Sequence, residues 1–138
     1  MTTRKTLTFA LMDPPFESAR STTALRLIDA ALRRGLDVQV FAYEGAVSLA
    51  LAGQKAHPNA IHGRSAEEED HPLPRDWIAA LHDEALRQGS RLEWVNCGLC
   101  VDERGAEPSV PGPRRGSPAD LARMIEQSDN TLVVPTGD

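Results

Sequence analysis

Residues 92–105 read LEWVNCGLCVDERG, and the prediction of the fold begins with this stretch. The apolar run at 92–95 predicts a buried strand that ends at Asn96, directly before the first of two cysteines. The following residues predict a short helix that Gly105 ends. A strand that passes into a helix at Cys97 is typical of α/β proteins, in which ligands bind at the carboxyl ends of the strands.

Strands and helices alternate along the rest of the chain. Apolar runs predict further strands at 5–12, 38–43 and 131–134. Apolar periodicity and boundary residues predict helices from 18 to a cap at Gly35, at 46–51, from 76 or 77 to 86, and from Ser117 to about 127. This order predicts βαβ units and an α/β fold around a mostly parallel open sheet.

Two stretches lack apolar periodicity. Residues 54–74 contain three histidines (His57, His62 and His71), three prolines and the acidic run 67–70. Residues 107–116 are rich in proline and contain Arg114 and Arg115 near their end. We expect the first stretch to be a long loop, and loops of this length are usually functional or disordered.

Composition limits the class of protein. The chain has 138 residues, which fits a single domain over 1–138, and 41% of them are hydrophobic. Its net charge of −5 argues against direct binding of nucleic acid, which needs clustered Lys and Arg. No segment approaches the roughly 18 apolar residues that a membrane-spanning helix needs. We therefore expect a soluble, cytoplasmic protein.

The two cysteines, Cys97 and Cys100, require a chemical explanation. In a reducing compartment a CxxC pair is more often catalytic or metal-binding than a structural disulfide. At a helix N-terminus, exposed N–H groups would favour the thiolate of Cys97, and the thiolate is the nucleophile. Helical spacing would place Cys100 and Arg104 on the same face, so these three residues form the predicted catalytic site.

Alternative interpretations of the pair remain open. Cys-Gly-Leu-Cys also suits a thiol-disulfide oxidoreductase, although thioredoxin-type pairs usually follow an early strand and open a longer helix. A zinc site would need Cys97, Cys100 and two of the three loop histidines, whose spacing is irregular. We therefore predict no metal and no cofactor. Asp13, at the end of the first strand, either lines the same crevice or caps the following turn.

The motif Cys97-x-x-Cys100-x-x-x-Arg104-Gly105, after a short strand, resembles a segment of the DsrE-like family. This family includes the DsrE, DsrF and TusD subunits of sulfur-relay complexes. The helix around 24–27, the segment 46–54 and the closing residues 128–130 are similar as well. The resemblance therefore extends over nearly the whole chain.

The resemblance implies a three-layer fold with helices on both faces of the sheet. It implies that Cys97 carries sulfane sulfur as a persulfide, whereas only some members have the cysteine at the position of Cys100. Thiol exchange would allow Cys100 to attack Cys97 and assist release, which is our own hypothesis. It also implies trimers or hexamers that exchange sulfur with donor and acceptor proteins, as a sulfurtransferase-like carrier. A subunit that only helps to assemble the oligomer is a further alternative.

Overall fold

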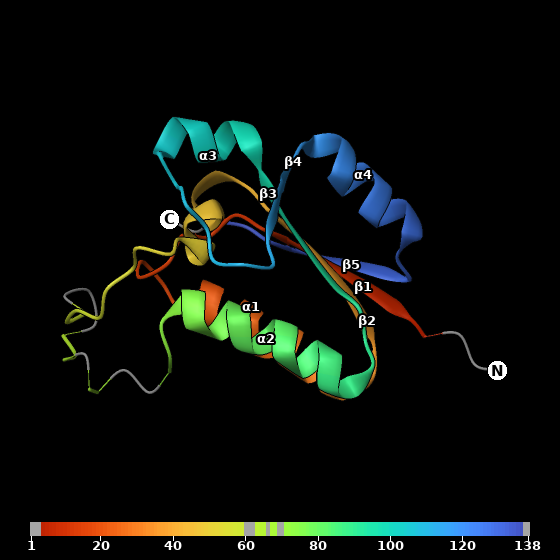
Figure 1. Ribbon diagram of the computed structural model, residues 1–138, viewed down its shortest axis with the longest axis horizontal. Coiled ribbons are helices and arrows are strands. Elements are labelled where there is room, and N and C mark those ends of the chain that lie inside the picture. The colour runs from red at the N-terminus through yellow and green to blue at the C-terminus, as the bar shows by residue number, and fades with distance from the viewer. Residues whose placement is uncertain (1–3, 60–62, 66, 69–70, 137–138) are drawn as a thin grey trace.

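Five parallel strands form one sheet in the order β4-β3-β2-β1-β5 (Figure 1). The structure is a computed structural model, and it describes residues 4–59, 63–65, 67–68 and 71–136. The strands are β1 (Thr6–Leu11), β2 (Asp37–Ala42), β3 (Leu92–Cys97), β4 (Arg114–Gly116) and β5 (Asn130–Val134). The predicted parallel α/β sheet is therefore confirmed.

Helices cover both faces of the sheet. They are α1 (Arg20–Arg33), the 3-10 helix η1 (Glu44–Ala50), α2 (Pro74–Gln88), α3 (Gly98–Arg104) and α4 (Pro118–Gln127). Helices α1 and α2 lie side by side on one face, and α3 and α4 lie on the other, which gives three layers (Figure 1). Within the described ranges, no helix is both long and apolar enough to span a bilayer.

The apolar core has two parts, one on each face of the sheet. Successive side chains of β3 point to opposite faces of the sheet, so this one strand contributes residues to both parts of the core. Trp94 packs in the cluster beneath α1 and α2, whereas Val95 and Cys97 pack in the cluster beneath α3 and α4. The side chain of Cys97 therefore points toward the α3 and α4 layer.

The structure differs from the sequence prediction at three elements. Strand β4 lies within 107–116, where we predicted only irregular chain. It has three residues, largely exposed, and follows several prolines, so it has no apolar periodicity. The helix predicted at 46–51 is a 3-10 helix that begins at Glu44, and α1 begins at Arg20 rather than at 18.

The loop that follows η1 is anchored at its start. Gln54 is buried, and its amide nitrogen donates to the carbonyl oxygens of Ser48 and Leu49, at 2.8 Å each. Its amide oxygen accepts a hydrogen bond from the backbone N–H of Arg75 at 3.0 Å. Gln54 thus fixes the end of η1 against the start of α2.

The start of α4 is held by a capping box at Ser117, the residue that the sequence predicts as the N-cap. The Asp120 carboxylate accepts a hydrogen bond from the Ser117 N–H at 2.9 Å, and the Ser117 side chain accepts one from the backbone N–H of Asp120. Asp120 also pairs with Arg114 of β4 at 2.9 Å. The Ser117 N–H and Arg114 together lower the pKa of Asp120 from 3.8 to about 2. This carboxylate therefore joins the edge strand to α4.

We expect Asp120→Asn to lower the free energy of unfolding near neutral pH by about 1 kcal/mol, because it removes a charged cap. The folded pKa lies below the unfolded value, so the carboxylate stabilises the fold above about pH 4 and loses this effect as the pH falls toward 2. The difference between variant and wild type should therefore shrink over that range. Denaturant unfolding at several pH values measures it, with the exposed Asp83→Asn as control. An unchanged difference at pH 2 would contradict the assignment.

Candidate functional site

Cys97 is the last residue of β3 and the N-cap of α3. Its side chain is 5% exposed and is a free thiol. The buried residues of its cluster come from β2, η1, β3, α3 and α4 and the chain after α3: Phe41, Val47, Val95, Val101, Ala106 and Met124. The predicted strand-to-helix corner is thus present, with the thiol turned inward.

Cys100 lies one turn further along α3 and is half-buried. Its side chain packs against the cluster that contains Cys97, and its Sγ accepts a hydrogen bond from the backbone N–H of Glu44 at 3.2 Å. Burial raises the pKa of Cys100, the neighbouring Cys97 raises it further, and the Glu44 N–H opposes both effects. Cys100 is therefore held as a thiol near neutral pH.

Glu44 is a site residue that the sequence analysis missed. It follows β2 at the start of η1, and its φ of 51° lies in the left-handed region, which is uncommon for a residue other than glycine. Its backbone contacts Cys100, and its carboxylate accepts a hydrogen bond from Arg104 at 3.1 Å. Its position directly after a buried strand was the available signal, because the carboxyl ends of parallel strands share one edge.

Arg104 lies at the end of α3, and its guanidinium binds carboxylates. It pairs with Glu44 at 3.1 Å and with Glu103 at 3.7 Å. Arg104 is thus linked to Cys100 through Glu44, and the pair ties α3 to η1. Gly105 ends α3 with φ 61°, as the sequence predicts.

Arg115 is a second residue to which the sequence analysis gave no role at this site. The pairing of β3 with β4 sets Gly116 beside Cys97, which brings Arg115 to the start of α3. A Cβ atom on Gly98 would lie 2.8 Å from the Arg115 Nε, so a larger residue there would require the Arg115 side chain to shift. Arg115 also pairs with Asp102 of α3 at 2.8 Å. It therefore braces the helix that carries both cysteines.

Asp13, for which two roles were left open, caps the turn that leads to α1. It is buried, and its carboxylate accepts a hydrogen bond from the Ser18 hydroxyl at 2.7 Å. Ser18 in turn accepts one from the backbone N–H of Arg20 at 3.1 Å. Asp13 therefore organises the start of α1.

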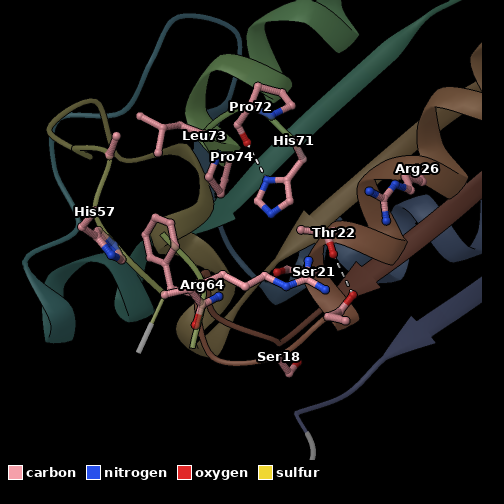
Figure 2. A pocket seen from close by; sticks show the side chains of 14 residues that line it. Ser18, Ser21, Thr22, Arg26, His57, Arg64, His71, Pro72, Leu73 and Pro74 are labelled. Atoms are coloured by element: carbon pink, nitrogen blue, oxygen red, sulfur yellow. Dashed lines mark hydrogen bonds between the residues drawn. The ribbon is translucent and has the colours of Figure 1, made fainter. Parts of the chain in front are cut away.

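The two described histidines of the long loop lie outside the cysteine cluster. His57 and His71 line a cavity of about 610 Å³ beside the first turns of α1 (Figure 2). His62 lies outside the described residues. Across the described ranges, no group of three or more His, Cys, Asp or Glu side chains is arranged to hold a metal ion.

Comparison with known proteins identifies relatives over nearly the full chain. A family model described as the DsrE/DsrF-like family matches residues 5–134. An uncharacterized protein of Methanopyrus kandleri, MK0008, is 26% identical over 130 residues, which cover 91% of each chain. The family model confirms the resemblance that rested on the cysteine motif.

Two solved structures share the fold. The YchN protein of E. coli matches with a TM-score of 0.68 and 22% identity, over 95% of this chain and 99% of that chain. BT1422 of Bacteroides thetaiotaomicron, a conserved protein of unknown function, matches with a TM-score of 0.57 and 12% identity, over 94% and 95%. Members of the matched family work in sulfur-relay complexes. On its sequence and its fold, the chain belongs to the DsrE/DsrF-like family.

Proposed function

We propose that this protein is a sulfur carrier that holds sulfane sulfur as a persulfide on Cys97. The observation that carries the proposal is the thiol pair at the end of β3, where Cys100 on α3 packs against the cluster that contains Cys97, in a chain of the DsrE/DsrF-like family. The carboxyl edge of a parallel sheet is the usual ligand-binding edge, which supports the same site.

The proposed chemistry is an exchange between sulfur atoms. The Cys97 thiolate attacks the terminal sulfur of a donor persulfide, the donor leaves as a thiolate, and Cys97 becomes a persulfide. A thiolate of an acceptor protein then attacks that terminal sulfur and restores the Cys97 thiolate. Without an acceptor, Cys100 attacks the inner sulfur of Cys97, releases hydrosulfide and leaves a Cys97–Cys100 disulfide, which a thiol reductant must reopen.

The different environments of the two thiols suit this division of roles. Cys100 is held protonated by burial, so it attacks slowly and the persulfide has time to meet an acceptor. Cys97 is 5% exposed, so the donor reaches it only after α3 moves. The pair between Arg104 and Glu44, which ties α3 to η1, opposes that movement.

Protein partners are part of the proposal. Leu99 lies between the two cysteines and is 71% exposed, so donor and acceptor proteins have an apolar contact at the site. Strand β5 lies at the edge of the sheet, and its Leu132 and Val133 are 44% and 53% exposed. We assign this edge to the contacts between copies of the chain in a homo-oligomer, a trimer or hexamer. We place this oligomer in the cytoplasm.

We expect Cys97→Ser to abolish sulfur loading, because it removes the atom to which sulfur binds. Reduced protein is incubated with a low-molecular-weight persulfide and analysed by intact-protein mass spectrometry and peptide mapping. The wild type should gain one sulfur atom on the peptide that contains Cys97. Loading of the Cys97→Ser variant to the wild-type level would rule out this residue as the carrier.

Cys100→Ser is the matched variant, and it tests release rather than loading. It should still load sulfur on Cys97 but should not release sulfide in the absence of an acceptor, since no second thiol can form the disulfide. Sulfide measured over time in both proteins checks this. Equal release from both proteins would exclude Cys100 from the release step.

We expect Arg104→Gln to increase the alkylation rate of Cys97 about two- to fivefold, because an exposed ion pair contributes at most about 1 kcal/mol. Timed labelling with iodoacetamide under native conditions, read by peptide mapping, measures the rate. Arg87→Gln removes an ion pair with Glu84 on α2 and serves as the control. If both variants label like the wild type, the Arg104–Glu44 pair does not limit access.

The packing of Cys100 against the cluster that contains Cys97 also supports a second candidate, a thiol-disulfide oxidoreductase. Insulin reduction coupled to a thiol reductant distinguishes the two functions. Rapid turnover, with only a Cys97–Cys100 disulfide after treatment with the persulfide donor, would favour the oxidoreductase. No change at either cysteine would favour a subunit that serves assembly alone.

A further inference from the structure

The 610 Å³ cavity beside α1 is separate from the cysteines. Three parts of the chain form it: the connection between β1 and α1, the first two turns of α1, and the loop that leads to α2 (Figure 2). Strand β2 lies between β1 and β3 in the sheet. The thiol of Cys97 points to the opposite layer, so the cavity requires its own explanation.

The charge of the cavity is opposite to that of the chain. The chain has a net charge of −5, yet the described residues that line the cavity include two arginines, Arg26 and Arg64, and no carboxylate. Arg26 lies 5.7 Å from the ring of Trp77. The Arg64 side chain extends toward Ser21 and Thr22 in the first turn of α1 (Figure 2). One cationic side chain, Arg64, therefore approaches the N-terminus of a 14-residue helix, and Arg26 lines the same cavity.

Ser21 is a second, independent indication of a ligand. The residue is 3% exposed and lines the cavity, and its hydroxyl makes no hydrogen bond to another described residue. The hydroxyl oxygen is not among the fully buried unpaired atoms, so it is open to the cavity and free to donate to a ligand there. The first turn of a helix also presents backbone N–H groups that have no partner inside the helix. Ser21 and these N–H groups form a set of donors for an oxyanion.

The remainder of the cavity is apolar and aromatic. Phe16 packs edge-on against His57, with ring centroids 4.5 Å apart, and Leu73 lies on the same lining. Phe16 has φ 72°, a conformation that is strained for a bulky residue and is typically kept at functional sites. The volume falls within the range of about 300–1,000 Å³ that accommodates small organic ligands. A free oxyanion would leave most of this space unused.

We propose that the cavity binds a small phosphate monoester of about the size of a mononucleotide. The phosphate lies at the first turn of α1, where Ser21, Arg64 and the helix N–H groups donate hydrogen bonds. The organic group packs against Phe16 and Leu73. Asp13 is hydrogen-bonded to Ser18, and among the described residues no carboxylate lines the cavity.

Adenosine monophosphate, adenosine and inorganic phosphate are the probes. Calorimetry of the wild-type protein should show that adenosine monophosphate binds more tightly than either of its parts. Ser21→Ala and Arg64→Gln should each weaken it at least about tenfold, because each removes a hydrogen bond to a charged group. Arg91→Gln removes an exposed arginine outside the cavity and should bind like the wild type.

Amide NMR spectra provide the positional readout. The backbone amides of Ser21 and Thr22 should shift with adenosine monophosphate and with phosphate but not with adenosine. Arg64 is exposed, so the Arg64→Gln variant should fold normally. If this variant binds adenosine monophosphate as tightly as the wild type, the oxyanion assignment is overturned. If inorganic phosphate binds as tightly as adenosine monophosphate, the proposal that the organic group packs against Phe16 and Leu73 is overturned. Sulfur loading on Cys97 is measured separately, so failure here leaves the sulfur-carrier proposal unaffected.

Discussion

The parallel alignment of all five strands is the constraint on which both regions depend. Because the strands run in one direction, the ends of β1, β2 and β3 lie at one edge of the sheet. Beyond this edge, the backbone N–H and C=O groups no longer have hydrogen-bond partners in the sheet. Side chains and helix termini must therefore provide those hydrogen bonds. Cys97, Glu44 and the first turn of α1 gather there for that reason. Their distance along the chain is irrelevant once the sheet has formed.

Most of the fold was predictable because buried parallel strands have a clear apolar pattern. Strands β1, β2 and β3 were found in this way, and the N-cap residue Ser117 followed by Pro118 marked the start of α4. Strand β4 was missed because an edge strand of three exposed residues has no such pattern. What defines it is its register against β3, which exists only in the folded chain.

The site was predictable only in part, for a similar reason. Local spacing placed Cys97 and Cys100 at a strand-to-helix corner, since both lie in one continuous stretch. The contact of Glu44 with Cys100 joins residues 56 positions apart, and Arg115 reaches Gly98 through the pairing of β4. Periodicity and motif spacing describe neighbours along the chain. They cannot identify groups that the sheet brings together from different loops.

The 3-10 helix η1 is the element that lies between the two regions. At its start Glu44 contacts Cys100, and the adjacent Gly45 packs so closely on Pro14 that a Cβ atom there would lie 2.7 Å away. At its end Gln54 holds the start of α2, where Pro74 lines the cavity. Because η1 is short and is held at both ends, we expect it to move as a rigid unit. The thiol pair and the cavity therefore differ in chemistry, but both contact elements that η1 holds in place.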